Sequence, residues 1–195
     1  PGYIASLRDF TFFDFALPAL QKLKDNRFCI VTNQSGVSRG IIEQNELNKI
    51  HHYVQTAFKD HGLDLLDIFV CNDHPDHATE RRKPGTGMFF EAAKIYGIDL
   101  ANSVMIGDGI ADMEAAQSLI MDGILVRTGK GSESESHFIK SEFPIAVVDN
   151  LEKAVEGAIA MGWVGFNCSI PNKIEVIQYI DRLAKSAEII EIGRA

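Results

Sequence analysis

The feature that most constrains this chain is the regular alternation of short apolar runs with longer stretches that carry apolar residues every three or four positions. Strands buried on both faces have continuous apolar sequences, whereas the helices that cover them show the longer period. The alternation continues over most of the sequence. It predicts an α/β domain with a mostly parallel sheet covered by helices.

The same pattern predicts the positions of the individual elements. Strands are expected at residues 28–33, 68–71, 103–108, 123–127 and 144–148. Helices are expected at residues 17–24, 43–61, 88–96, 111–120 and 151–161. Residues 34–40 and 128–136, rich in Gly and Ser, are expected to be loops, the second of them mobile and solvated. Residues 1–162 are interpreted as the core and residues 163–195 as a C-terminal appendage of unknown role.

Composition excludes several classes of protein. A chain of 195 residues, 46% of them hydrophobic, suits one soluble domain. Its net charge of −8 argues against a nucleic-acid partner or an anionic membrane surface. No apolar run approaches the roughly 20 residues that span a bilayer. Three scattered cysteines argue against a disulfide framework, so a reducing, cytoplasmic location is expected.

Three polar groups fall at the carboxyl ends of the expected strands. They are the pair Thr32 and Asn33, the run 81–83 that includes Lys83, and Asp108 with Asp112. Ligands of open parallel sheets bind at the carboxyl ends of the strands, where loops and helix N-termini converge. A hydroxyl and a lysine can hold phosphate oxygens, and two carboxylates can hold Mg²⁺. The pattern therefore predicts a phosphoryl-transfer site.

These residues also carry a family resemblance. The string Thr-Asn-Gln-Ser-Gly-Val-Ser-Arg-Gly at 32–40, Arg-Lys-Pro at 82–84, Ile-Gly-Asp at 106–108 and Leu-Val-Arg-Thr-Gly at 125–129 resemble the haloacid dehalogenase (HAD) superfamily. Within it they are most similar to the heptose 1,7-bisphosphate phosphatases and the related histidinol-phosphatases, over about residues 1–155. The resemblance implies a three-layer α/β/α, Rossmann-like sandwich without a large cap domain.

The resemblance also implies roles for the residues that would contact phosphate. Thr32 would bind the transferred phosphoryl group through its hydroxyl, with Asn33 beside it. Lys83 would neutralise the phosphate charge, and Arg82 would help to hold it. Arg39 is a candidate for binding a second, distal phosphate.

The metal and the nucleophile are implied in the same way. Asp108 would bind Mg²⁺, and Asp112 would support the water shell of the metal or orient Lys83. In this family one aspartate attacks phosphorus and a second acts as acid and base, both from an aspartate-x-aspartate-glycine-threonine motif. That motif should precede Pro1, and neither Asp9 nor Asp14 follows an apolar strand. We therefore expect this chain to be truncated at its N-terminus and inactive by itself.

A second departure from the family concerns zinc. Many relatives carry a cysteine-x-histidine and cysteine-x-cysteine loop before arginine-lysine-proline. Here Cys71 is kept, but Asp73, Thr79 and Arg81 stand at the other three positions. Since arginine cannot bind Zn²⁺, no structural zinc is expected. The remaining acidic and histidine residues of the loop are expected to be solvated rather than to form a transition-metal site: Asp73, His74, Asp76 and His77.

Structural explanations remain open for each singled-out residue. Thr32 and Asn33 could form an ordinary turn, and Lys83 could be a solvated lysine. Asp108 could cap a helix, and Asp112 could be a first-turn charge on its helix.

The function that these residues favour is Mg²⁺-dependent hydrolysis of a small sugar bisphosphate, chiefly heptose 1,7-bisphosphate at its C7 phosphate. Such a reaction would supply heptose precursors of bacterial surface polysaccharide. Three alternatives stay open. They are a histidinol-phosphate phosphatase, a polynucleotide 3′-phosphatase, which the net charge disfavours, and an inactive remnant that only binds phosphorylated ligands. The oligomeric state is left open.

Overall fold

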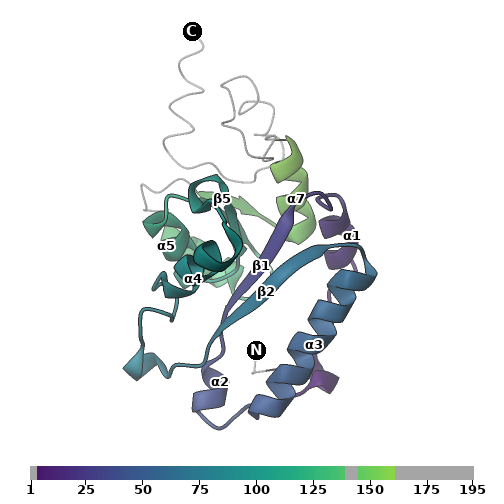
Figure 1. The fold of residues 1–195 in the computed structure, drawn as a ribbon. Helices are drawn as coiled ribbons and strands as arrows, with labels where there is room; N and C mark the ends of the chain where they lie inside the picture. Colours follow the sequence, from purple (N-terminus) through teal and green to yellow (C-terminus); the bar gives the residue numbers. More distant parts are fainter. Residues whose placement is uncertain (1–3, 139–144, 161–195) are drawn as a thin grey trace. The chain divides into compact units, whose positions relative to one another are not determined.

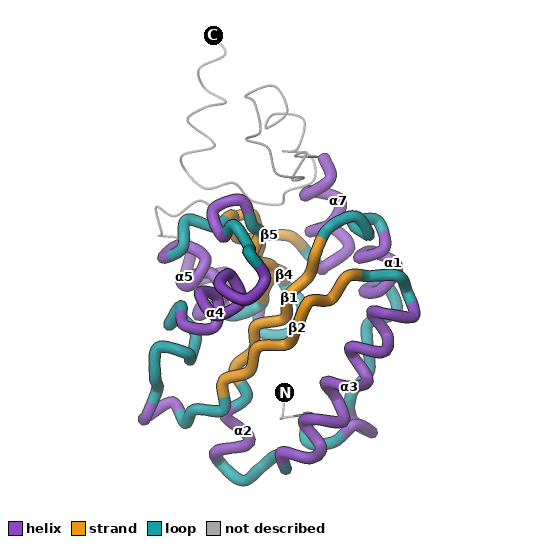
Figure 2. Tube along the Cα trace, in the orientation of Figure 1, coloured by secondary structure: helices purple, strands orange, loops and turns teal. Residues whose placement is uncertain are grey.

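The computed structural model of the protein describes residues 4–138 and 145–160. The chain divides into two compact units, Pro1–Ile98 and Asp99–Ala195, each of which is described by itself. Both units are α/β, and all of their described strand pairs are parallel, as the sequence predicts (Figures 1 and 2). The expected appendage, residues 163–195, lies outside the described residues.

The first unit is built on two strands, β1 (Arg27–Asn33) and β2 (Asp64–Cys71). Thr32 pairs with Val70 and Asn33 pairs with Cys71, so the carboxyl ends of both strands lie at the same edge. The helices of this unit are η1 (Leu7–Asp9), α1 (Ala16–Gln21), α2 (Ser35–Ser38), α3 (Gln44–Asp60), η2 (Pro75–His77) and α4 (Gly87–Tyr96).

Alternating side chains of β1 pack against different helices. Phe28 and Ile30 pack with the cluster around Phe58 of α3, whereas Cys29 and Val31 pack with the cluster around Met88 of α4. Successive side chains of a strand point to opposite faces of a sheet. The two strands therefore form the middle layer between α3 and α4 (Figure 2).

The second unit contains a three-stranded sheet in the order β3-β4-β5. Its strands are β3 (Val104–Gly107), β4 (Asp122–Val126) and β5 (Ile145–Val148). Its helices are η3 (Leu100–Asn102), α5 (Ile110–Ser118), α6 (Gly131–Phe138) and α7 (Leu151–Ala160). Leu125 packs with Met113 of α5 and Phe138 of α6, while the neighbouring Ile124 packs with Ala154 of α7. This sheet is thus also covered on both faces.

Three expectations about local structure were wrong. Residues 131–138 form helix α6 instead of part of a mobile loop. Residues 35–38 form the short helix α2 inside the expected loop 34–40. Strand β2 begins at Asp64, four residues before the expected start. Asp64 and Asp67 interrupt its apolar pattern, and aspartate is depleted in strands, so local sequence understates the strand that β1 stabilises by pairing.

The remaining expected strands and helices are present with small shifts at their ends. Within residues 4–138 and 145–160, none of the helices combines the length and the apolarity that crossing a membrane would need.

Candidate active site

Three of the predicted phosphate-contacting residues meet at the carboxyl end of β1. The Asn33 Nδ2 donates a hydrogen bond to the Lys83 carbonyl at 3.0 Å, and the Lys83 amide donates to Asn33 Oδ1 at 3.0 Å. The Lys83 Nζ donates to the carbonyl of Val31 at 2.5 Å. Thr32 lies between these contacts, and its Oγ1 accepts from Gln34 Nε2 at 3.1 Å. The fold therefore brings Lys83 to Thr32 across 50 residues of sequence.

Close packing of the backbone holds the segment around Lys83 in place. The Gly85 amide donates to the Arg82 carbonyl at 2.7 Å, and the Gly87 amide donates to the Glu80 carbonyl at 2.8 Å. A Cβ atom at Gly85 would lie 2.5 Å from that Glu80 oxygen, so only glycine fits there. Only 9% of Lys83 is exposed. The interpretation of Lys83 as a solvated surface lysine is therefore wrong.

The two arginines have different surroundings. The Arg82 Nη1 donates to the Asp73 carbonyl at 3.1 Å, which ties the loop after β2 to the segment before Lys83. Arg39 is exposed beyond the C-terminal end of α2. Within the described part of the chain, the Arg39 side chain makes no hydrogen bond or ion pair with another residue. Its role in binding a distal phosphate stays a prediction.

Residues at the expected zinc-ligand positions contact one another directly. The Asp73 Oδ2 accepts the Thr79 amide at 2.8 Å and the Thr79 Oγ1 at 2.6 Å. These two bonds, with a further one from the Cys71 side chain, lower the pKa of the Asp73 carboxyl. Arg81 forms an ion pair with Glu91 of α4. In the described residues, no three His, Cys, Asp or Glu side chains are grouped so that they could hold a metal ion.

The second unit contains the predicted magnesium ligand, Asp108, directly after β3. The Asp108 Oδ2 accepts the Lys130 amide at 2.8 Å, and the Ser134 Oγ donates to the Asp108 carbonyl at 2.8 Å. Asp112 is nearly buried, and its Oδ2 accepts the Gly109 amide at 3.0 Å, closing the N-terminus of α5. Asp112 is thus an acidic first-turn residue of α5, as the sequence left open, and in addition its side chain caps the helix, whereas Asp108 does not cap α5.

The chemistry of Asp108 fits a hard cation. Mg²⁺ is usually bound in proteins by one or two carboxylates together with phosphate oxygens and water. One oxygen of Asp108, Oδ2, is committed to the Lys130 amide, and among the described residues nothing donates a hydrogen bond to Oδ1. The contacts from Lys130 and Ser134 were not predicted, because the segment was interpreted as a solvated loop. Its two glycines, Gly129 and Gly131, were the only sequence signal of a close backbone approach.

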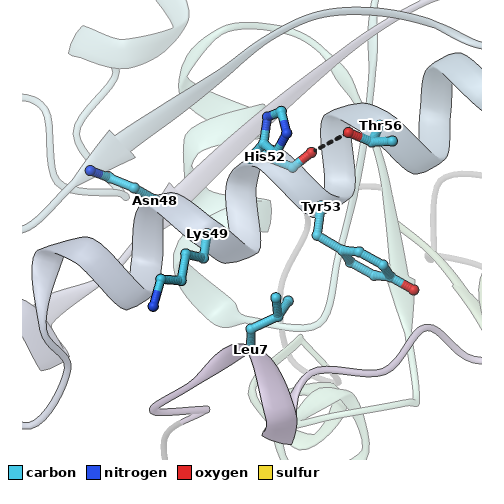
Figure 3. A pocket seen from close by; sticks show the side chains of 6 residues that line it. All are labelled: Leu7, Asn48, Lys49, His52, Tyr53 and Thr56. Atoms are coloured by element: carbon cyan, nitrogen blue, oxygen red, sulfur yellow. Dashed lines mark hydrogen bonds between the residues drawn. The ribbon is translucent and has the colours of Figure 1, made fainter.

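A separate hollow of about 540 Å³ is lined by residues of α3 and by Leu7 of η1 (Figure 3). None of the predicted site residues lines it. Lys49, the cation at its rim, is paired with Glu46 at 2.6 Å. The hollow therefore offers an anionic ligand no unpaired lysine. Its lining residues are Leu7, Asn48, Lys49, His52, Tyr53 and Thr56.

Sequence comparison identifies relatives that cover most of this chain. A D-glycero-beta-D-manno-heptose-1,7-bisphosphate 7-phosphatase of Photorhabdus laumondii is 35% identical over 166 residues, which cover 80% of this chain and 88% of that protein. The chain belongs to the heptose bisphosphate phosphatase family of the HAD superfamily. A family member from Yersinia pestis with the same name is 34% identical, over 80% of this chain and 87% of its own length.

Structure comparison agrees with this family membership. The crystal structure of D,D-heptose 1.7-bisphosphate phosphatase from B. bronchiseptica, complexed with magnesium and phosphate, matches with a TM-score of 0.74 at 30% identity. The match covers 80% of this chain and 88% of that one. The HAD-hydrolase-like family profile matches residues 80–154 of this HAD phosphatase. A profile of the shikimate dehydrogenase substrate binding domain matches residues 132–192, which lie mostly outside the described residues.

Proposed function

We propose that this protein hydrolyses a phosphomonoester of a small sugar bisphosphate with Mg²⁺, chiefly the C7 phosphate of D-glycero-D-manno-heptose 1,7-bisphosphate. The observation that carries the proposal is the hydrogen-bonded pair Asn33 and Lys83, which fixes an ammonium group beside Thr32 at a strand end. The names of the relatives from P. laumondii and Y. pestis support the substrate. The magnesium and phosphate in the B. bronchiseptica structure support the cofactor.

Each residue has a distinct role in the proposed reaction. The Thr32 hydroxyl donates to a phosphoryl oxygen, and the Lys83 ammonium neutralises the charge that develops on the phosphoryl group. Asn33 holds the backbone of Lys83 in position. Asp108 holds Mg²⁺, which when bound would neutralise phosphate charge and polarise the phosphorus–oxygen bonds.

The described residues do not supply the attacking aspartate of the family reaction. Asp9 is in η1 and accepts the Ser6 hydroxyl at 2.8 Å, and Asp14 is exposed in the turn before α1. Neither residue follows a strand, so neither is placed where a parallel sheet presents its ligands. The assay therefore uses the protein expressed from its full reading frame.

The experiment measures phosphate release from heptose 1,7-bisphosphate and from histidinol phosphate, with Mg²⁺ and with EDTA. We expect Mg²⁺-dependent hydrolysis of the sugar bisphosphate. Lys83→Met should lower kcat by about 100-fold to 1,000-fold, the usual effect of removing one transition-state-stabilising group. Lys94→Met, which removes an exposed lysine of α4, is the matched control and should keep full activity.

Two outcomes would replace the proposal. Turnover of histidinol phosphate alone would assign the histidinol-phosphatase activity. Binding of phosphate without any turnover would favour the inactive, ligand-binding remnant. A small phosphorylated metabolite as the partner, a cytoplasmic location and a place in surface-polysaccharide precursor synthesis belong to the same proposal. The free thiols of Cys29 and Cys71 are consistent with a reducing compartment.

A further inference from the structure

The carboxylate of Asp108 is held by a segment that follows it by more than 20 residues. The Lys130 amide donates to Oδ2 at 2.8 Å, and the buried Ser134 hydroxyl donates to the Asp108 carbonyl at 2.8 Å. One bond fixes the side chain and the other fixes the backbone of the same residue. Together they determine which carboxylate oxygen is turned away from the segment, namely Oδ1.

Two glycines allow this segment to approach so closely. Gly129 has a φ of 64°, and a Cβ atom there would lie 2.2 Å from Asp108 Oδ2. A Cβ atom at Gly131 would lie 1.7 Å from the carbonyl oxygen of Val126. Any other residue at either position would force the turn away from β4 or displace the carboxylate.

An ion pair connects this turn to the body of the second unit. The Arg127 Nε and Nη2 donate to the two carboxylate oxygens of Glu135 in α6, at 2.9 and 3.0 Å. The Arg127 Nη1 donates to Asp149, after β5, at 3.0 Å. Such a two-pronged arginine–carboxylate contact restricts orientation more than a single bond does. The middle of α6 is therefore held near the end of β4.

We propose that the turn Thr128–Gly131, with Ser134, is a positioning element that commits Asp108 Oδ2 to the Lys130 amide, so that Asp108 offers the metal ion one oxygen, Oδ1. This inference rests on the proposed function, in which Asp108 holds Mg²⁺. Mg²⁺ requires near-ideal octahedral geometry, to which a single carboxylate oxygen contributes one defined ligand position. Groups that orient metal ligands typically change metal affinity by about 10-fold to 100-fold when they are removed.

The test compares two alanine substitutions at glycines with the same backbone conformation. Gly129→Ala places a methyl group against Asp108. At Gly97, also at a φ of 64°, a Cβ atom would have no described atom within 4 Å apart from those of its own chain neighbours. Binding of Mn²⁺, a paramagnetic substitute for Mg²⁺, is measured by electron paramagnetic resonance on the protein from its full reading frame. We expect Gly129→Ala to raise the Mn²⁺ Kd by about 10-fold or more, and Gly97→Ala to change it less than twofold.

A second pair of variants keeps the test decisive if Gly129→Ala does not fold. Ser134→Ala removes the bond to the Asp108 carbonyl, while Ser136→Ala removes an exposed hydroxyl of the same helix that donates to the carbonyl of Glu133. We expect Ser134→Ala to bind Mn²⁺ more weakly than wild type and Ser136→Ala to bind it equally well. The circular dichroism spectra of both variants should match that of the wild type.

The possible failures are distinguishable. Wild-type protein that binds no Mn²⁺ overturns the assignment of Asp108 in the proposed function, and the positioning role with it. Wild-type binding together with unchanged Kd values for folded Gly129→Ala or Ser134→Ala overturns the positioning role alone. Equal weakening by Gly129→Ala and Gly97→Ala also overturns it, because backbone strain alone would then explain the effect.

Discussion

Single residues decide how the loop after β2 stays closed. The Asp73 carboxylate accepts two hydrogen bonds from Thr79, so this loop is linked across its base by the side chains of the chain itself. These residues stand at the positions where the family resemblance led us to look for zinc ligands. A carboxylate with two short bonds can close a loop without a metal ion, and its contribution then depends on ionisation.

The pH dependence of this loop is a testable consequence. Because its bonds to Thr79 lower the pKa of Asp73 in the folded protein, ionisation of Asp73 stabilises the fold. This stabilisation is fully present above the unfolded-state pKa of about 3.9 and is lost as the pH falls through the lower, folded-state pKa. We expect the NMR signal of the Thr79 amide to shift in that acidic range. Asp73→Asn should abolish the transition, and Asp76→Asn in the same loop should keep it.

Zinc content tests the same loop independently. Atomic-emission analysis of purified protein should find no stoichiometric zinc, and chelator treatment should leave the Thr79 amide signal unchanged. One equivalent of zinc would contradict the metal-free interpretation of the Asp73–Thr79 pair.

Asn33 is the residue that joins β1 to the Lys83 segment. Asn33→Ala would leave the amide and the carbonyl of Lys83 without these partners. We expect a loss of about 1–3 kcal/mol in the free energy of unfolding, measured in urea, since a partly buried backbone group would lose its bond. Asn48→Ala on the exposed face of α3 should change stability by less than about 0.5 kcal/mol. Equal effects of both variants would contradict the linking role of Asn33.

Among the elements, α6 shows most clearly how tertiary contacts determine local structure. Its sequence, Gly-Ser-Glu-Ser-Glu-Ser-His-Phe, has weak helix propensity and is typical of a solvated loop. The segment is nevertheless helical, because three of its residues make tertiary contacts: Phe138 packs in the core, Ser134 bonds to Asp108 and Glu135 pairs with Arg127. Helix stability in proteins comes mostly from such packing and less from propensity.

This dependence makes α6 sensitive to one ion pair. Glu135→Gln removes the negative charge beside Arg127, whose side chain is 26% exposed, and we expect amide hydrogen exchange to speed up selectively in residues 131–138. Glu133→Gln, on the exposed side of the same helix, should leave exchange near the wild-type rate. Equal acceleration in both variants would show that helix charge, rather than the Arg127 contact, holds α6.

At the scale of the whole molecule, ligand binding should be visible as added stability. A ligand that binds only the folded state at 100 times its Kd adds about 2.7 kcal/mol. We expect Mg²⁺ with phosphate to raise the Tm of the protein from its full reading frame, and EDTA to reverse the shift. Asp108→Asn should remove the Mg²⁺-dependent part, while Asp99→Asn, at the N-cap of η3, should retain it. A Tm insensitive to Mg²⁺ would contradict the metal assignment.

The local pattern of apolar residues in the sequence was enough to determine the fold class of this protein. Continuous apolar runs and three-to-four periodicity depend only on near neighbours, so the parallel α/β architecture, most element positions and the strand-end location of Thr32 and Asp108 could be predicted. Tertiary structure alone decided which distant groups meet. Asn33 pairs with Lys83, Asp73 with Thr79, and Lys130 with Asp108, each through one or two directional hydrogen bonds. Such bonds do not produce a periodic pattern in the sequence, because the two partners come together only after the backbone has folded.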